Sequence, residues 1–172
     1  MAELISVLNE DEIKKLVADV AQKISDDYKD SELVLIGVLK GAFVFMADLI
    51  RKITIPVKID FVAISSYGSN TVSSGKINLT RNIEINIKNK DVLIVEDIVD
   101  TGLTLKYLID YLKSFAPKSV KICAMLNKYE RRETEIEVAY QCYRIEEGFI
   151  VGYGIDYAED YRYLPAIYHL KQ

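Results

Sequence analysis

Acidic and hydroxyl side chains gather in one short part of the chain, residues 96–104. Glu96, Asp97 and Asp100 place three carboxylates within five residues, directly after the apolar run Val92-Leu93-Ile94-Val95. Carboxylates this close repel one another, so they indicate a site for a cation or for a set of hydroxyl groups. The next residues, Thr101-Gly102-Leu103-Thr104, open a predicted helix, whose free N–H groups, two hydroxyls and positive end suit a phosphate. The run therefore predicts a site for a sugar phosphate, whereas a lone Asp-Thr-Gly would indicate only a capped helix beside surface acids.

Two more polar segments follow apolar runs. Lys40 and Gly41 come after residues 33–39, and Lys128 comes just after residues 120–126. Each lysine taken alone is typical of a surface side chain at the end of a strand, with its stem on the protein and its charge in water. In an open α/β sheet, however, ligands bind beyond the carboxyl ends of the strands. We therefore expect both lysines to lie near the acidic run.

The elements that position these residues alternate between strand and helix. The apolar runs at residues 33–39, 91–96 and 120–126 are typical of strands buried on both faces of a sheet. Helices are predicted from Asn9 to residues 26–29, over residues 41–52 and over residues 101–115. This alternation predicts an α/β fold with a parallel sheet that helices cover on both faces.

The remaining segments give weaker strand signals. Residues 57–66, 137–143 and 149–155 are predicted as further strands, and residues 77–79 and 83–87 alternate as in a hairpin or an edge pair. The polar segment between them, YGSNTVSSGK at residues 67–76, is rich in glycine and serine and is predicted as a loop.

Composition bounds the class of protein. The chain has 172 residues, of which 50% are apolar and 28% charged, which predicts one globular domain over residues 1–172. A net charge of −4 argues against a surface that coats nucleic acid. Two cysteines and one histidine exclude a disulfide scaffold and an HExxH metal site. The start of the chain lacks a signal-peptide pattern, and Lys40 interrupts the best membrane candidate, residues 33–50. We expect a soluble cytoplasmic protein with no nucleic-acid or membrane partner.

Residues 92–104 resemble the phosphoribosyl-pyrophosphate (PRPP) signature of the type I phosphoribosyltransferases. The resemblance extends over residues 33–165 and includes several separated motifs in the order of that family. It implies the fold of that family: a central parallel sheet of about five strands flanked by helices, with a small hood from the N- and C-terminal parts. It also implies a Mg²⁺-dependent purine salvage enzyme. The reaction would transfer the 5-phosphoribosyl group from PRPP to hypoxanthine, and to guanine, giving IMP or GMP and pyrophosphate.

The resemblance assigns roles around the ribose and the 5′-phosphate. Glu96 and Asp97 match the acidic pair that holds the ribose 2′- and 3′-hydroxyls and helps to place Mg²⁺. Asp100 matches the acid beside purine N7, which is the candidate proton acceptor, and it also belongs to the predicted PRPP-binding segment. The backbone and hydroxyls of residues 101–104 match the cradle for the 5′-phosphate; some relatives have lysine where this chain has Leu103, which leaves the backbone cradle in place.

Roles around the pyrophosphate follow in the same way. Lys40 and Gly41 match a pyrophosphate-binding turn that in this family holds a non-proline cis peptide, and Arg162 matches a pyrophosphate contact. Ser66 and Tyr67 open the loop that in the family closes over PRPP as a lid.

A last group of residues matches the purine pocket. Lys128 matches the donor to the purine 6-oxo group, and Phe149 matches the ring that stacks on the base. Backbone groups of Ile150 and Asp156 would read the edge of the base, and the Asp156 carboxylate would meet a second Mg²⁺ through water.

Two alternative functions belong to other classes of protein. PRPP-sensing, RNA-binding regulators of pyrimidine genes share the PRPP loop but need a basic surface, whereas this chain has a net charge of −4. A phospho-signalling receiver would carry its acidic pair after the first strand, and here Glu96 and Asp97 lie past the middle of the chain. For the transferase we expect a homodimer or a homotetramer. The sequence leaves open that choice, the preference between hypoxanthine and guanine, and the use of xanthine.

Overall fold

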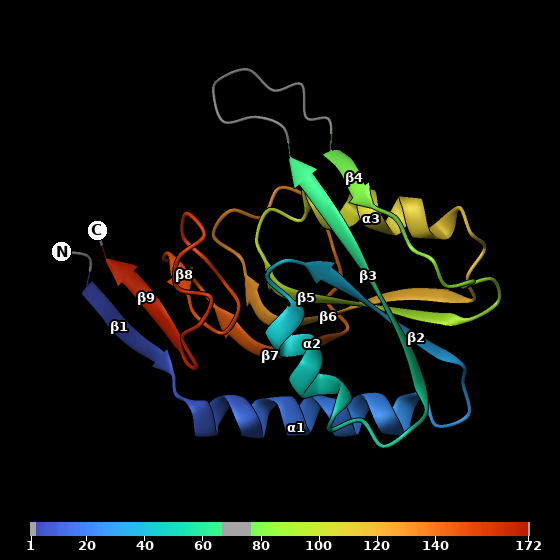
Figure 1. Ribbon diagram of the computed structural model, residues 1–172, viewed down its shortest axis with the longest axis horizontal. Coiled ribbons are helices and arrows are strands. Elements are labelled where there is room, and N and C mark those ends of the chain that lie inside the picture. The colour runs from blue at the N-terminus through green and yellow to red at the C-terminus, as the bar shows by residue number, and fades with distance from the viewer. Residues whose placement is uncertain (1–2, 67–76, 172) are drawn as a thin grey trace.

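The computed structural model describes residues 3–66 and 77–171, in which strands and helices alternate over much of the chain (Figure 1). The elements are, in chain order, β1 (Glu3–Leu8), α1 (Glu10–Asp27), β2 (Leu33–Leu39), α2 (Phe43–Ile50), β3 (Val57–Ser66), β4 (Ile77–Arg81), β5 (Asp91–Val99), α3 (Leu103–Lys113), β6 (Ser119–Lys128), β7 (Tyr140–Ile145), β8 (Ile150–Val151) and β9 (Ile167–Lys171).

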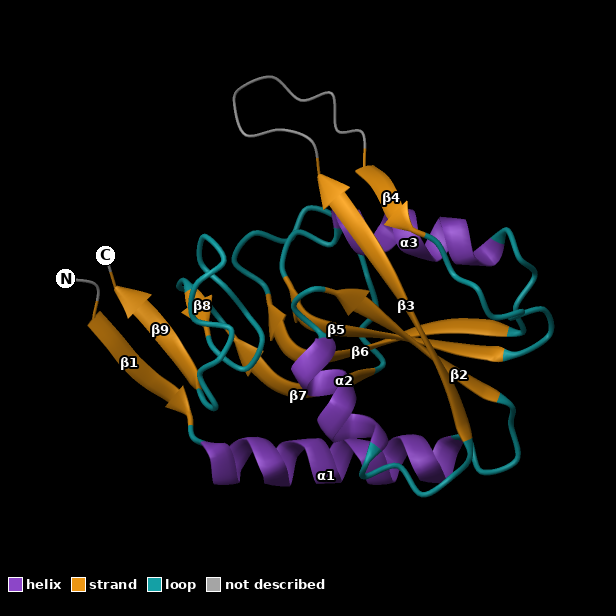
Figure 2. Cartoon of the chain, in the orientation of Figure 1, coloured by secondary structure: helices purple, strands orange, loops and turns teal. Residues whose placement is uncertain are grey.

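The central sheet of the described residues has six strands in the order β4-β3-β2-β5-β6-β7. Five of these strands, in the order β3-β2-β5-β6-β7, are parallel to one another, and β4 pairs antiparallel with β3 at the edge. α1 and α2 pack on one face of the sheet and α3 packs on the other (Figure 2). The parallel sheet of about five strands with helices on both faces is therefore confirmed.

Strand β2 shows why the apolar runs are continuous. Leu33 and Leu35 face the hydrophobic cluster under α1 and α2, whereas Val34 and Ile36 face the cluster that contains Leu108 of α3. All of these side chains are buried. Because side chains alternate between the faces of a strand, a strand covered on both faces needs apolar residues at every position.

Helix α1 begins where the sequence predicts it. The Asn9 side chain accepts a hydrogen bond from Glu12 N at 2.9 Å, and the Glu12 side chain accepts one from Asn9 N at 2.8 Å. This capping box satisfies two N–H groups that the first turn leaves free. Ile13, Val17 and Val20 are buried against the sheet side of the helix.

A second, antiparallel sheet in the order β1-β9-β8 joins the two ends of the chain and forms the expected hood (Figure 1). The sequence predicts neither β1 nor β9, because these strands pair with each other from opposite ends of the chain and lack a local hairpin signal. The strand predicted over residues 149–155 is wrong beyond Val151. Gly152, Tyr153 and Gly154 have φ angles of 96°, 53° and 95°, so the chain turns there.

Of the hairpin or edge pair predicted at residues 77–79 and 83–87, the first segment is confirmed as an edge strand, β4, and the second is wrong. β4 pairs with β3 instead, and residues 83–87 form no strand. The backbone N–H groups of Glu84 and Ile85 donate to Asp60 Oδ2 at 2.6 and 3.1 Å, so a side chain takes the donors that a strand partner would need. The alternation of apolar residues instead reflects packing, since Ile87 is buried in the cluster under α3.

Replacing Asp60 with Ala should lower the free energy of unfolding by about 2–3 kcal/mol, because the buried carboxylate satisfies several N–H groups at once. Urea denaturation at pH 7 measures this. Asp30→Ala is the matched control, since Asp30 is exposed, and it should change stability by at most about 0.5 kcal/mol. Equal losses in the two variants would contradict the role of Asp60.

The same carboxylate predicts an acid-side pH dependence. Burial alone would raise the pKa of Asp60, but hydrogen bonds from the backbone N–H groups of Glu84, Phe61 and Ile85, with the charge of Arg81, lower it overall. A lowered pKa stabilises the fold above the unfolded value, about 3.9, and this stabilisation is lost as the pH falls through the folded pKa. The stability difference between the parent and Asp60→Ala should therefore shrink below about pH 4.

Within the described residues, we find no helix whose length and apolar character would allow it to cross a bilayer.

Candidate active site

Two neighbouring carboxylates lie near the carboxyl end of β5. Glu96 is buried and Asp97 is half-buried, and Asp97 N donates to Glu96 Oε1 at 3.1 Å. Burial, and then the adjacent Asp97 charge, raise the pKa of Glu96 well above its usual range. Burial also raises the pKa of Asp97. Two carboxylates that water stabilises poorly favour a cation or hydroxyl donors as their partner.

The segment after this pair surrounds a hollow of about 180 Å³, lined by residues 96–102, 104 and 105. α3 begins at its edge, and Gly102 precedes the helix with a φ of 86° and offers no side-chain cap. A Cβ on Gly102 would lie 2.9 Å from Thr134 Cγ2, so both the conformation and the space require glycine. At the start of α3, Leu103 N donates only a long hydrogen bond, 3.4 Å, to Thr101 Oγ1, and this helix start fits the phosphate site that the sequence predicts.

Asp100 lies on the turn between β5 and α3. Its Oδ2 is 3.8 Å from Arg131 Nη1. Its Oδ1 is buried and has no hydrogen-bond partner among the described residues. A buried acceptor without a partner is unusual in a folded protein and indicates a place where a ligand can donate a hydrogen bond.

Arg132 holds this turn in place, and the sequence analysis does not single it out. Its guanidinium donates to the Asp100 carbonyl at 2.9 Å, to Asn127 Oδ1 at 2.6 Å and to the Lys128 carbonyl at 2.8 Å. The acidic turn after β5 is therefore tied to the end of β6. Only the basic pair at residues 131–132 marks it in the sequence, and a pair of arginines is common on protein surfaces.

Lys128 is a buried residue and not the exposed strand-end lysine of the alternative interpretation. Its side chain is 8% exposed, and its Nζ donates to the Gly148 carbonyl at 2.8 Å and lies 3.2 Å from Glu130 Oε2. Phe149, the next residue after Gly148, is half exposed. Its ring packs edge to face against that of Tyr157, with 5.2 Å between the ring centroids. The Lys128 ammonium thus contacts Gly148, and the open aromatic ring of Phe149 belongs to the next residue of the chain.

Ile150 and Asp156, the two other residues assigned to the base, differ in burial. Ile150 is in β8 and its side chain is buried in the core, so only its backbone is available to a ligand. Asp156 is half-buried and follows the turn at Gly154.

The turn after β2 contacts the acidic pair. The Leu39–Lys40 peptide bond is cis, as the resemblance implies. A Cβ on Gly41 would lie 1.8 Å from Asp97 Oδ2, and a Cβ on Gly154 would lie 2.4 Å from the Gly41 carbonyl oxygen. Glycine at both positions therefore lets the backbone of the turn pack between Asp97 and the segment after β8.

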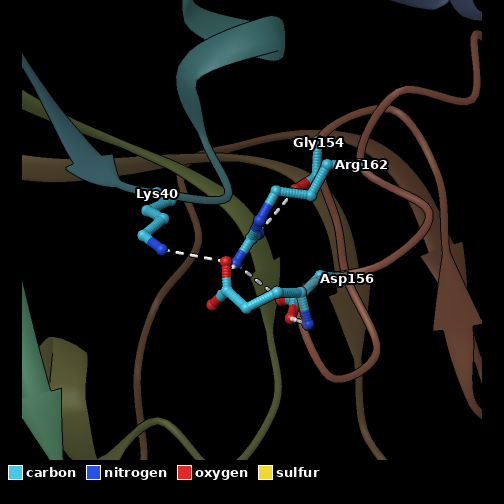
Figure 3. Close-up of polar contacts among 5 residues, drawn as sticks. Lys40, Gly154, Asp156 and Arg162 are labelled. Carbon is cyan, nitrogen blue, oxygen red and sulfur yellow. Dashed lines mark hydrogen bonds and ion pairs between the residues drawn. The ribbon is translucent and has the colours of Figure 1, made fainter.

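Lys40 and Arg162, two of the three residues predicted to contact pyrophosphate, come together at this turn (Figure 3). Arg162 Nη1 donates to the Gly154 carbonyl at 2.8 Å, and Nη2 is 2.9 Å from Asp156 Oδ1. Lys40 Nζ is 2.8 Å from Glu159 Oε2, and Glu159 Oε1 is 3.5 Å from Arg162 Nη2. Glu159 is the second residue that sequence reasoning missed.

The acids are arranged to fit Mg²⁺ bound together with a substrate. In the described part of the chain, no three His, Cys, Asp or Glu side chains gather as a metal cage. Glu96 and Asp97 are adjacent, whereas the Asp156 oxygens accept from Arg162 and from Glu159 N. Mg²⁺ commonly binds one or two carboxylates and completes its shell with water and substrate phosphates. The acidic pair, with Glu96 buried and Asp97 half-buried, fits that mode.

Most of the predicted lid lies outside the residues that the structure describes. Ser66 is the last residue of β3, and Tyr67 with the rest of residues 67–76 lies outside the described residues.

Comparisons with known proteins find a matching family and related proteins. The family model described as "Phosphoribosyl transferase domain" matches residues 6–158. The chain is 47% identical to the hypoxanthine-guanine phosphoribosyltransferase of Dictyostelium discoideum, over 96% of this chain and 94% of that protein. It is 42% identical to the Bacillus subtilis (strain 168) hypoxanthine-guanine phosphoribosyltransferase, over 96% and 92%.

A solved structure gives the same result. The crystal structure of a hypoxanthine-guanine phosphoribosyltransferase from Bacillus anthracis str. 'Ames Ancestor' is 42% identical and superimposes with a TM-score of 0.92, covering 100% of both chains. The family model spans most of the chain, and the relatives match it over nearly their full length. The chain therefore belongs to the phosphoribosyl transferase domain family.

Proposed function

We propose that this protein transfers the 5-phosphoribosyl group from PRPP to a 6-oxopurine, hypoxanthine or guanine, and releases pyrophosphate. The observation that carries the proposal is the register of two neighbouring strands. Val99 of β5 pairs with Asn127 of β6, so Asp100 and Lys128 follow at the same level of the sheet. A 6-oxopurine has its O6 acceptor next to N7 on one edge. Lys128 can donate to O6, and the free Asp100 Oδ1 can accept from N7 of the base tautomer that carries its proton at N7 and attacks through N9.

The chemistry requires stabilisation of charge on both sides of the bond that breaks. The C1′–O bond of PRPP breaks, the C1′–N9 bond forms, and negative charge develops on the leaving pyrophosphate. We assign Glu96 and Asp97 to the ribose hydroxyls and Mg²⁺, and residues 101–104 to the 5′-phosphate. The Lys40 and Arg162 side chains and the Gly41 backbone would bind the pyrophosphate. When bound, Mg²⁺ neutralises part of the charge on that leaving group. Asp100 would accept the N7 proton or orient the base.

Three further properties stay predictions. We expect a homodimer or homotetramer, a cytoplasmic location and a lid at residues 67–76. Cys123 and Cys142 are buried free thiols, which suits a reducing compartment.

A panel of bases tests the proposed function. Hypoxanthine, guanine, xanthine, adenine and uracil are each incubated with PRPP and Mg²⁺, and nucleotide formation is followed by absorbance. We expect turnover with hypoxanthine and guanine, and little with adenine or uracil. Turnover of none of the bases, together with salt-sensitive RNA retention in a filter-binding assay, would instead support the PRPP-sensing RNA-binding regulator.

Replacing Lys128 with Ala should weaken discrimination against adenine. Lysine only donates, so it can pair with a 6-oxo group but not with a 6-amino group. A site built around such a hydrogen bond rejects analogues that leave it unpaired. We expect the ratio of kcat/KM for hypoxanthine to that for adenine to fall at least about tenfold, for a lost bond to a charged group.

Lys121→Ala is the matched control for this prediction. Lys121 lies on the same strand but is exposed, and its replacement should leave the ratio unchanged. An unchanged ratio in Lys128→Ala would remove Lys128 from the base pocket.

A further inference from the structure

Glu159 lies on a tight turn that projects its carboxylate toward the pyrophosphate side of the site. Ala158 and Glu159 have positive φ angles of 51° and 68°, and Asp156 Oδ2 accepts a hydrogen bond from Glu159 N at 2.8 Å. Tyr157 and Asp160 close the turn by exchanging backbone hydrogen bonds at 3.1 and 3.0 Å. The position of the Glu159 backbone is thus fixed from both sides.

The carboxylate of Glu159 bridges two cations from distant parts of the chain. Its Oε2 is 2.8 Å from Lys40 Nζ on the turn after β2, and its Oε1 is 3.5 Å from Arg162 Nη2. An exposed glutamate such as Glu159 carries its negative charge at neutral pH. Two oxygens of one anion between a lysine and an arginine resemble the contacts of a phosphate group, and Arg162 Nη2 also lies 2.9 Å from Asp156 Oδ1.

This contact is exposed and therefore exchangeable. The side chains of Lys40 and Glu159 are each 66% exposed. Ion pairs in water contribute little free energy, since solvent screens them and long side chains lose freedom in forming them. A diphosphate, which carries several charges and brings Mg²⁺, would compete for the same two cations with more charge-assisted hydrogen bonds.

We infer that Glu159 is an internal competitor for the diphosphate: it occupies Lys40 and Arg162 in the ligand-free protein and leaves them when a diphosphate binds. This inference rests on the proposed function, which assigns the same two cations to pyrophosphate. Glu159 is then an affinity-determining residue for PRPP and pyrophosphate. It has no such effect on the nucleotide product, which has no diphosphate.

Glu159→Gln tests the inference, because the amide keeps the size of the side chain but loses the charge that competes. Asp160→Asn is the matched control: Asp160 is the exposed neighbour on the same turn, and among the described residues its carboxylate contacts neither Lys40 nor Arg162. Calorimetry in the presence of Mg²⁺ measures the binding of inorganic pyrophosphate, PRPP and IMP to the parent and to each variant. Thermal unfolding without ligand checks that all three proteins are folded.

We expect Glu159→Gln to bind pyrophosphate and PRPP about 2- to 5-fold more tightly, which is the range for the loss of an exposed ion pair. Its affinity for IMP should stay within about 1.5-fold of the parent, and Asp160→Asn should stay within that range for all three ligands. In steady state, KM for PRPP should fall in Glu159→Gln, and pyrophosphate should inhibit at correspondingly lower concentration.

Three results would overturn the inference while leaving the proposed function intact. Pyrophosphate and PRPP could bind Glu159→Gln no more tightly than the parent, IMP could gain affinity equally, or Asp160→Asn could match Glu159→Gln. The last two would show a general effect of charge in place of competition at Lys40 and Arg162. A folded parent protein that binds neither PRPP nor pyrophosphate would overturn the proposed function, and the inference with it.

Discussion

Replacing Glu96 with Gln and Asp97 with Asn in one protein should weaken PRPP binding about 100-fold in the presence of Mg²⁺. Both carboxylates are assigned to the ribose hydroxyls and the metal, and each charged hydrogen bond contributes about 1.5–3 kcal/mol. The amides keep the size of both side chains but neither attract a divalent cation nor accept as strongly from hydroxyls. Calorimetric titration with PRPP measures the loss.

The same double variant should be no less stable than the parent without ligand. Burial raises the pKa of both acids, and the Asp97 charge raises that of Glu96 further, so their charges oppose folding in the ligand-free protein. Neutral side chains remove that cost, as expected where a site is arranged for function at the expense of stability. Urea denaturation should give an equal or higher free energy of unfolding.

Glu10→Gln with Asp11→Asn is the matched control for this prediction. It makes the same two changes at an adjacent, exposed Glu–Asp pair in the first turn of α1. PRPP affinity should be unchanged there. If the control and the Glu96/Asp97 variant lose PRPP affinity equally, or if the latter loses affinity only because it unfolds, the acidic pair does not hold the substrate.

Replacing Asp100 with Asn should lower kcat with hypoxanthine about 100-fold and leave PRPP affinity within about threefold. Assistance from a general base is typically worth about 10²–10⁴-fold, and Asn keeps the shape of Asp but cannot accept a proton at neutral pH. The loss falls at the lower end of this range, since Asn can still orient N7 and departure of pyrophosphate contributes most of the barrier. Steady-state kinetics across pH, together with PRPP calorimetry, separate the two effects.

Asp110→Asn provides the control, because Asp110 is an exposed residue of α3 and its replacement should leave kcat and PRPP affinity unchanged. The division of roles is wrong if Asp100→Asn keeps kcat within about threefold of the parent. It is equally wrong if that variant loses PRPP affinity as severely as the Glu96/Asp97 variant.

The part of the site that follows strand ends could be predicted from the sequence. Glu96, Asp97 and Asp100 are close in the chain, so their proximity in space needs no knowledge of the fold. Lys128 could be placed near them because the carboxyl ends of parallel strands meet at one edge of a sheet. Continuous apolar runs such as residues 33–39 also predict buried strands from the segment alone, because a strand covered on both faces needs apolar residues at every position.

The missed features depend on contacts between distant segments. Lys40 and Glu159 are 119 residues apart, and the sequence around either residue gives no sign that the two side chains are in contact. Arg132 donates to the backbone carbonyl groups of Asp100 and Lys128. Every residue has such a carbonyl, so the sequence does not show which ones an arginine will contact. Residues 83–87 are predicted as a strand but form none, because the carboxylate of Asp60 accepts from the backbone N–H groups of Glu84 and Ile85, which a strand partner would need.

Phosphorus-containing substrates and products give the most direct test of phosphoribosyl transfer to a purine. Phosphorus nuclear magnetic resonance of PRPP, hypoxanthine, Mg²⁺ and the protein resolves PRPP, IMP and pyrophosphate in one sample. IMP and pyrophosphate should appear in equal amounts as PRPP disappears, and omission of hypoxanthine should stop the formation of both. PRPP that stays unchanged, or pyrophosphate that appears without IMP, would contradict transfer of the phosphoribosyl group to a purine.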